Sequence, residues 1–316
     1  METIFNVFLV SIGLAVLYFG ANWFVDGSVT IAKKLRISQI VIGLTIVAFG
    51  TSAPELAVNV SAALNGIPDV VMGNIVGSNI LNVGLILGLS AIVSPLLVKK
   101  VTIKKEVPIM IGVSIVLIMM SIDGVLSLID GIILVAGVLF FVFFSYKSSK
   151  KEEIDLEEVP AGLKLEKANV MPKSILLLGI GLSLLTVGAF LTINNAVVLA
   201  KTIGVTERII GLTLVAVGTS LPELTTSIIA AKKGHFDLSV GNIIGSNIFN
   251  ILAILGISAA IIDISIADET FFDYYVMLAF CLVLIPIMKT GFVISRIEGI
   301  SLVAGYIAYI SFLLFF

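Results

Sequence analysis

The chain of 316 residues is 59% hydrophobic and only 13% charged, and its mean hydropathy is +1.18. Soluble domains are typically about 45–50% apolar, so this composition excludes a soluble globular protein and indicates a polytopic membrane protein. The net charge of −2 averages over two membrane faces and identifies no partner, and the single cysteine, Cys281, excludes an intrachain disulfide.

Ten membrane-spanning helices are predicted, because a bilayer core about 30 Å thick needs roughly 20 apolar residues per helix. The first apolar run follows Met1, Glu2 and Thr3 without a basic stretch, so we expect a first spanning helix rather than a cleaved signal. The predicted spans are 5–24, 40–64, 70–94, 107–122, 127–145, 174–200, 209–231, 238–262, 271–288 and 297–316.

Two sequence blocks occur twice, each time 168 residues apart. The first block reads GLTIVAFGTSAPE at 43–55 and GLTLVAVGTSLPE at 211–223, with ten of thirteen positions identical. The second reads GNIVGSNILNVGLILGLS at 73–90 and GNIIGSNIFNILAILGIS at 241–258, with twelve of eighteen identical. Because five spans is an odd number, two copies of a five-span unit enter the membrane in opposite directions, which predicts an inverted repeat with its site at the midplane.

Loop charge predicts the orientation, because cytoplasmic loops of membrane proteins carry an excess of Lys and Arg. With ten spans, seventeen of the nineteen Lys and Arg residues fall on one side, and only Lys201 and Arg208 fall on the other. The basic side is predicted to be cytoplasmic, which places both chain ends outside, and we expect the protein in the cell membrane as a multi-pass protein.

Each copy of the first block places a glutamate, Glu55 or Glu223, inside an apolar span. An ionisable residue there costs about 2.5–3.5 kcal/mol and indicates a functional site. No basic residue lies inside a span near them to pair with. Polar residues spaced three or four apart share a helix face with each other or with a glutamate; they are Thr51, Ser52, Thr219, Ser220, Ser78, Asn82, Ser246 and Asn250.

Carboxylate, hydroxyl and amide oxygens are hard donors, which suits a cation such as Ca²⁺ and not a soft metal. Pro54 and Pro222 lack an N–H, so we also expect the carbonyls of Gly50 and Gly218 to lose their helical partners and to line the cavity. The predicted fold is therefore an all-α polytopic membrane protein with ten transmembrane helices, arranged as two inverted five-helix repeats with broken helices at the central ion site.

The domain organisation follows from the repeat. We expect residues 1–146 to form the first five-helix repeat and residues 173–316 to form the second, inverted one. The segment 147–172 mixes Lys and Glu and is predicted to be a solvated cytoplasmic linker, too short for a domain of its own.

The paired GTSxPE and GNxxGSN blocks resemble the α-repeats of the sodium/calcium exchanger family, in the cation/calcium antiporter superfamily, and the chain looks most like the short prokaryotic and archaeal members. The resemblance covers nearly the whole chain and implies that Glu55 and Glu223 share a Ca²⁺ site and contribute to Na⁺ sites. The other implied ligands are the hydroxyls of Thr51, Ser52, Thr219, Ser220, Ser78 and Ser246 and the backbone carbonyls of Ala48 and Ala216.

The chain departs from some relatives at Asn250, where certain exchangers of this family carry an aspartate; its repeat mate Asn82 is also an asparagine. Only two carboxylates are therefore expected at the centre, which disfavours a potassium-dependent mode. The first block also differs from that of the proton-coupled branch, which looks like GNxxE.

The resemblance implies an antiporter, not an enzyme, that exchanges Na⁺ for Ca²⁺ by alternating access, with three Na⁺ for one Ca²⁺ and no cofactor. The expected partners are Ca²⁺ and Na⁺ as substrates and the lipid bilayer, with no nucleic acid and no obligate protein partner. The first spans of the two halves, 5–24 and 174–200, are expected to slide as a gating pair.

Other functions stay open from the residues alone. A Ca²⁺/H⁺ antiporter would use the same glutamates as proton carriers, and a cation channel is a less favoured alternative, given the inverted repeat. A membrane enzyme is disfavoured because no span holds a nucleophile with a base, and the single histidine, His235, is predicted to lie in a loop.

Overall fold

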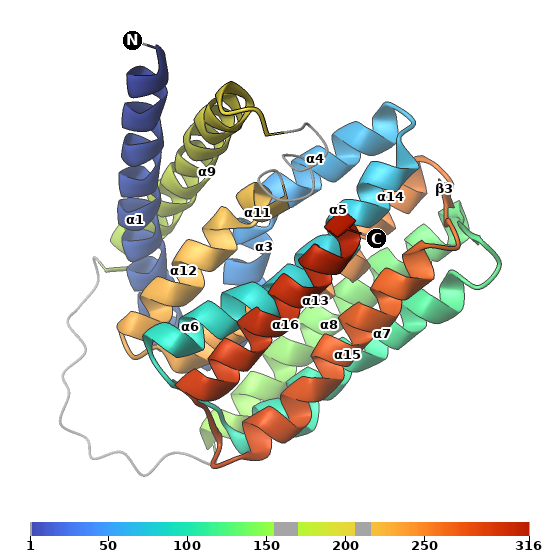
Figure 1. Ribbon diagram of the computed structural model, residues 1–316. Coiled ribbons are helices and arrows are strands. Elements are labelled where there is room, and N and C mark those ends of the chain that lie inside the picture. Colours follow the sequence, from blue (N-terminus) through green and yellow to red (C-terminus); the bar gives the residue numbers. More distant parts are fainter. Residues whose placement is uncertain (1, 155–169, 206–215, 316) are drawn as a thin grey trace.

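Helices dominate the computed structural model, which describes residues 2–154, 170–205 and 216–315 (Figure 1). The first half contains α1 Glu2–Leu35, α2 Gln39–Ile42, η1 Gly43–Val47, α3 Ala48–Thr51, α4 Ala53–Leu64, α5 Pro68–Leu81, η2 Asn82–Leu87, α6 Gly88–Val93, β1 Leu96–Leu97, η3 Thr102–Glu106, α7 Val107–Met120, β2 Val125–Leu126 and α8 Leu128–Ile154, where η denotes a π-helical segment. The second half contains α9 Val170–Thr202, α11 Ala216–Thr219, α12 Leu221–Lys232, α13 Phe236–Phe249, η5 Asn250–Leu255, α14 Gly256–Ile261, β3 Ile264–Ser265, α15 Thr270–Lys289, β4 Val293–Ile294 and α16 Arg296–Phe315.

The element boundaries repeat along the chain with the spacing of the sequence blocks. α12, α13, η5, α14 and β3 each begin and end 168 residues after α4, α5, η2, α6 and β1, respectively. The two halves of the sequence therefore fold into the same series of elements, including a π-helical segment at the same place in each.

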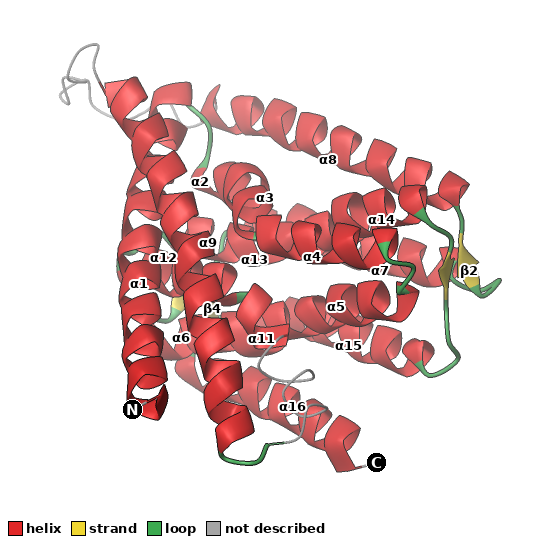
Figure 2. Cartoon of the chain, turned by 90° about the horizontal axis from the view of Figure 1, so that it is seen from above, coloured by secondary structure: helices red, strands yellow, loops and turns green. Residues whose placement is uncertain are grey.

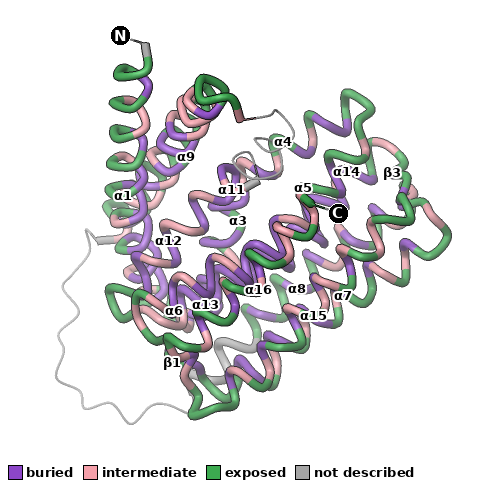
Figure 3. The backbone as a smooth tube through the Cα atoms, in the orientation of Figure 1, coloured by how far each residue is buried: buried purple, intermediate pink, exposed green. Residues whose placement is uncertain are grey.

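Two continuous helical stretches form the centre of the fold (Figure 3). Pro68–Val93 contains α5, η2 and α6, and Phe236–Ile261 contains α13, η5 and α14. In their most apolar windows 78% and 89% of residues are buried, against 22–33% in the other five long apolar helices. A helix that carries apolar or small residues on every side has no face that favours water, so it is buried in the protein. The surrounding helices are exposed on one face, which is the face expected to contact lipid.

The predicted helix break is confirmed at the first glutamate block. The segments Gln39–Thr51 and Ala53–Leu64 are bent by 49° at Ser52, whose ψ of 8° leaves the helical region. The two central stretches stay helical throughout and contain π-helical turns, which often occur at functional sites.

Helices α1 and α9 lie side by side at one edge of the molecule in both views (Figure 1, Figure 2). Their backbones approach closely at glycines: a Cβ on Gly188 would lie 2.8 Å from the Leu17 nitrogen, and one on Gly181 would lie 2.6 Å from the Phe24 nitrogen. Small residues permit this backbone contact between membrane helices, so α1 and α9 pack as one unit.

Two short strand pairs join the loops of the two halves. β1 pairs with β4 in antiparallel fashion, with Leu96 opposite Ile294, and β2 pairs with β3, with Val125 opposite Ser265. Each pair connects segments that lie far apart in sequence, so the loops that flank α7 and α15 are tied to the other half of the chain.

Seven helices in the described ranges are long and apolar enough to cross a membrane, and the bent pair around Ser52 would make an eighth. α1 is longer than its predicted span, because the helix continues through the polar residues up to Leu35. The predicted linker is helical at both ends, where α8 continues to Ile154 and α9 begins at Val170. Residues 209–215 of the predicted seventh span lie outside the described part of the chain.

Candidate functional site

The helix breaks place both glutamates at helix N-termini. α4 starts after Ser52 and α12 after Ser220, and each helix has its proline within the first two positions. Proline is tolerated there because the first N–H groups of a helix have no partner in any case. Glu55 and Glu223 follow in the first turn, where the positive end of the helix dipole stabilises a negative charge.

Each carboxylate is bound by a serine from the other half of the chain. The Ser52 hydroxyl donates to Glu223 Oε1 at 2.8 Å, and the Ser220 hydroxyl donates to Glu55 Oε1 at 2.9 Å. Ser52 Oγ also lies 3.3 Å from Ser246 Oγ of α13. The structure thus brings five of the predicted residues together across the two halves, with both glutamates at most 2% exposed.

Several oxygens at this centre are buried without a hydrogen-bond partner. They are Oε2 of Glu55 and of Glu223, Oδ1 of Asn82 and of Asn250, and Oγ of Ser78. Ser78 and Asn82 lie one turn apart on α5–η2, and Asn250 lies one turn after Ser246 on α13–η5. The helix of Glu55 packs on η5 and that of Glu223 packs on η2.

These unpartnered oxygens fit a cation. A buried polar group left unpaired costs about 1–3 kcal/mol, and a bound cation would satisfy several of them at once. Carboxylate, amide and hydroxyl oxygens are the donors that Ca²⁺ takes in six- to eight-fold coordination. No group of three His, Cys, Asp or Glu side chains that could hold a metal occurs in the described ranges, which fits a centre with only two carboxylates.

The remaining predicted ligands lie beside this centre. Thr51 is fully buried, and its hydroxyl oxygen lies 3.2 Å from Asn242 Oδ1 and 3.1 Å from the Val47 carbonyl oxygen, so its single proton is donated to one of these acceptors at a time. The Ala48 carbonyl already accepts the Ser52 N–H at 3.0 Å. Thr219 is buried at the end of α11, directly before Ser220. Ala216 is the first residue of α11, and its side chain lies outside the described part of the structure.

One expectation from the prolines is wrong. The Gly50 carbonyl accepts a backbone N–H where α3 ends, because the chain turns at Ser52 and the break supplies a new donor. Pro54 therefore starts a new helix and does not leave a free carbonyl at Gly50.

The sequence interpretation missed several asparagines. Asn79 and Asn247 bind each other across α5 and α13, and Asn242 donates to Ser227 Oγ at 2.9 Å and to the Glu223 carbonyl at 3.4 Å. Asn59 donates to the Glu55 carbonyl at 2.7 Å. Asn79, Asn247 and Asn242 belong to the repeated GNxxGSN blocks, and this repetition was the available signal.

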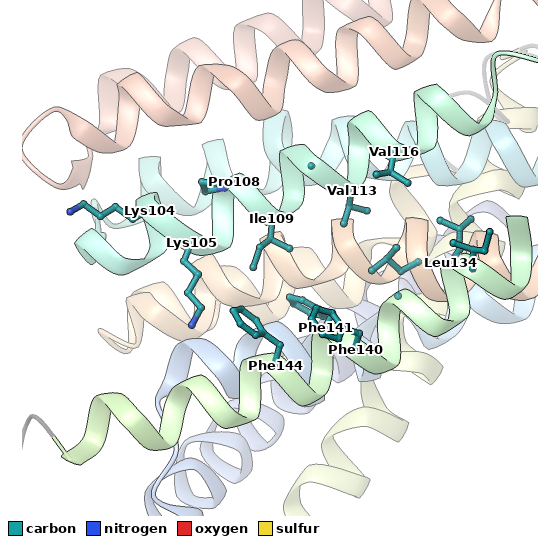
Figure 4. Close-up of a pocket in the computed structure, with 14 residues that line it drawn as sticks. Lys104, Lys105, Pro108, Ile109, Val113, Val116, Leu134, Phe140, Phe141 and Phe144 are labelled. Carbon is teal, nitrogen blue, oxygen red and sulfur yellow. The ribbon is translucent and has the colours of Figure 1, made fainter.

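The cavity shown in Figure 4 is not this site. It lies between α7 and α8, measures about 690 Å³, and is lined mostly by apolar side chains such as Ile109 and Phe141. Lys104 and Lys105 stand at one end, with Lys105 Nζ 5.0 Å from the centre of the Phe144 ring. The cavity contains no carboxylate, so it does not provide the donors that a cation needs.

His235 lies in the turn between α12 and α13, as predicted. Burial, followed by the charges of Lys33 and Lys233, lowers the pKa of its ring below the usual value. This shift favours the uncharged form of the ring.

The fold and this centre define a multi-pass membrane protein with a buried, oxygen-lined site between two halves of like structure. A family model described as sodium/calcium exchanger protein matches residues 5–147 and 173–315. The chain therefore belongs to the sodium/calcium exchanger family, a family of ion transporters.

Individual relatives agree with this assignment. The chain is 40% identical to the putative antiporter CaxA of Alkalimonas amylolytica, over 97% of each chain. It is 34% identical to the sodium/calcium exchanger MaX1 of Methanosarcina acetivorans, over 96% of this chain and 97% of the relative. A solved structure of the sodium-calcium exchanger NCX_Mj, soaked with zero Na⁺ and Ca²⁺, matches with a TM-score of 0.86 and 34% identity, covering 98% of this chain and 99% of that one.

Proposed function

We propose that this protein exchanges Na⁺ for Ca²⁺ across the membrane by alternating access, with Glu55 and Glu223 binding either ion in competition. The observation that carries the proposal is the set of buried oxygens without partners, led by one oxygen of each glutamate, between the two halves of the chain. The names of MaX1 and NCX_Mj, both sodium/calcium exchangers, support the choice of ions.

The charges of the site give the exchange a simple physical basis. Two ionised glutamates carry −2, which one Ca²⁺ neutralises, while two or three Na⁺ compete for the same oxygens. If the protein changes conformation only when ions occupy the site, then one set of ions must leave before the other set binds. Each transport of one ion is then followed by transport of the other in the opposite direction, which is exchange. Three Na⁺ for one Ca²⁺ moves one net charge per cycle, so the membrane potential adds about 2.3 kcal/mol per 100 mV. No cofactor takes part in this scheme.

The ligand set in the proposal includes hydroxyl, amide and carbonyl oxygens around the glutamates. The repetition of these residue types at matching positions of both halves supports the assignment. They are Thr51, Ser52, Thr219, Ser220, Ser78, Ser246, Asn82, Asn250, Ala48 and Ala216.

We further propose that the chain spans the membrane ten times as two inverted repeats, residues 1–146 and 173–316. The seven long apolar helices and the bent pair support eight spans. α7 with its preceding π-helical segment supports a ninth, and α11 with α12 supports a tenth, since α12 corresponds to α4 of the bent pair. An odd number of spans per repeat inverts the second copy.

The orientation rests on loop charge. Seventeen of nineteen Lys and Arg residues lie on the side of the linker 147–172 in this ten-span arrangement, so that side is cytoplasmic and both ends lie outside. The cell membrane is the proposed location.

Calcium uptake into proteoliposomes tests the proposal. Vesicles loaded with Na⁺ are diluted into Na⁺-free buffer with radioactive Ca²⁺, and controls carry equal Na⁺ on both sides or a pH gradient alone. Uptake that requires the outward Na⁺ gradient supports sodium/calcium exchange. Uptake driven by the pH gradient alone would instead assign the protein to Ca²⁺/H⁺ antiport, and uptake indifferent to both gradients would indicate a channel.

A further inference from the structure

Asn79 and Asn247 connect the two central helices through a closed set of hydrogen bonds. Asn79 Nδ2 donates to the Asn247 carbonyl at 3.3 Å, and Asn247 Nδ2 donates to the Asn79 carbonyl at 3.2 Å. The two residues are repeat mates, and both are 1% exposed. A backbone carbonyl only accepts, so these two bonds fix which end of each amide is nitrogen.

The orientation of the ligand amides follows from that of Asn79 and Asn247. Their Oδ1 atoms, which face away from the backbone carbonyls, accept from Asn82 and Asn250: Asn82 Nδ2 lies 2.9 Å from Asn247 Oδ1, and Asn250 Nδ2 lies 3.0 Å from Asn79 Oδ1. The Nδ2 atoms of Asn82 and Asn250 are thus hydrogen-bonded, whereas their Oδ1 atoms are buried without a hydrogen-bond partner.

We propose that Asn79 and Asn247 are positioning residues that turn the amide oxygens of Asn82 and Asn250, and not their NH₂ groups, toward the transported cation. An unrestrained amide presents either end, and an NH₂ group repels a cation. This inference rests on the proposed function, which makes Asn82 and Asn250 cation ligands.

One methionine side chain packs against Asn79 and another packs against Asn247. Asn79 Nδ2 lies 3.6 Å from Met277 Sδ of α15, and Asn247 Nδ2 lies 3.7 Å from Met110 Sδ of α7. Because a thioether sulfur is only a weak acceptor, these contacts help to fill space while the backbone carbonyls fix the orientation. Met277 therefore offers a control position next to Asn79.

The test is the Ca²⁺ dependence of exchange in Asn79→Leu, which keeps the approximate volume of the side chain but removes the acceptor for Asn250. Partners that orient metal ligands typically change metal affinity 10–100-fold when removed, so we expect the KM for Ca²⁺ to rise at least about tenfold with kcat little changed. Met277→Leu should leave the KM for Ca²⁺ unchanged. If Asn79→Leu does not yield folded protein, Asn79→Ala takes its place.

A double-mutant cycle separates orientation from general packing. If Asn79 acts through Asn250, adding Asn79→Leu to Asn250→Ala should raise the KM no further. An equal rise in both backgrounds, or a wild-type KM in a stably folded Asn79→Leu, would overturn the proposal. If the wild type shows no exchange at all, the proposed function fails, and equilibrium binding of radioactive Ca²⁺ to the same variants still tests the orientation.

Discussion

The contact between α1 and α9 gives a prediction that can be worked out from distances. A Cβ at Gly181 would lie 2.6 Å from the Phe24 nitrogen and 2.9 Å from the Gly20 oxygen, all backbone atoms that no rotamer change can move. Gly179, two residues earlier on the same helix, is a matched control, because a Cβ there would have no neighbour within 4 Å and that residue is exposed.

The expected effect is the difference between the two glycine-to-alanine variants. Both gain the helix propensity of alanine, about 0.8–1 kcal/mol, so this contribution cancels. Ordinary contact begins at 3.4 Å, so α1 and α9 must separate in Gly181→Ala. Overpacking of this kind costs about 1–3 kcal/mol, and Gly181→Ala should be less stable than Gly179→Ala by that amount.

The assay is reversible unfolding of both variants in the same detergent, with wild type alongside. Sodium-dependent Ca²⁺ uptake is measured on the same preparations, since we expect the α1–α9 pair to move as one unit during exchange. Equal stability of the two variants would refute the backbone-to-backbone packing of α1 on α9.

Three further predictions concern the site, the voltage dependence and the surface. Glu55→Gln and Glu223→Gln should each lower Ca²⁺ uptake more than about 100-fold while the protein stays monodisperse, because removing one partner of a buried charge pair costs about 3–5 kcal/mol; near-normal uptake would remove that residue from the site. With three Na⁺ leaving per Ca²⁺ entering, an inside-positive potential of about 60 mV should raise limiting Ca²⁺ accumulation about tenfold, at about 2.3 kcal/mol per charge per 100 mV; an unchanged limit would indicate electroneutral exchange. Lys233→Ala should change stability by less than about 1 kcal/mol, because its 2.8 Å pair with Asp26 is solvent-accessible; a larger loss by thermal unfolding would give the pair a structural role.

The central part of the fold could be predicted from the sequence because it depends on strong local signals. Pro54 in a polar GTSxPE block predicted a helix break, and the bend occurs at Ser52. The spacing of Ser52 and Glu55 predicted a shared polar face. In the structure the Ser52 hydroxyl donates a hydrogen bond to the carboxylate of Glu223. Which half supplies the partner was not predictable, since it depends on how the two halves pack.

Other features depend on contacts that helical spacing does not encode. A spacing of three or four residues pairs Ser78 with Asn82 and leaves out Asn79, which lies one position after Ser78 and about 100° around the helix. Its partner is Asn247, on a helix from the other half of the chain. The full length of α1 was missed because its polar last turns are not apolar enough to be recognised as a span, although they continue the helix.

Competition binding to the purified protein tests the central claim most directly. Radioactive Ca²⁺ is bound at equilibrium to wild type and to Glu223→Gln, and Na⁺ is then titrated in at constant ionic strength. If Glu55 and Glu223 hold one shared site, Na⁺ displaces all of the specifically bound Ca²⁺ from the wild type, with a Hill coefficient above one, and Glu223→Gln binds none. Ca²⁺ that stays bound at saturating Na⁺ would place the two ions at separate sites and would contradict the account.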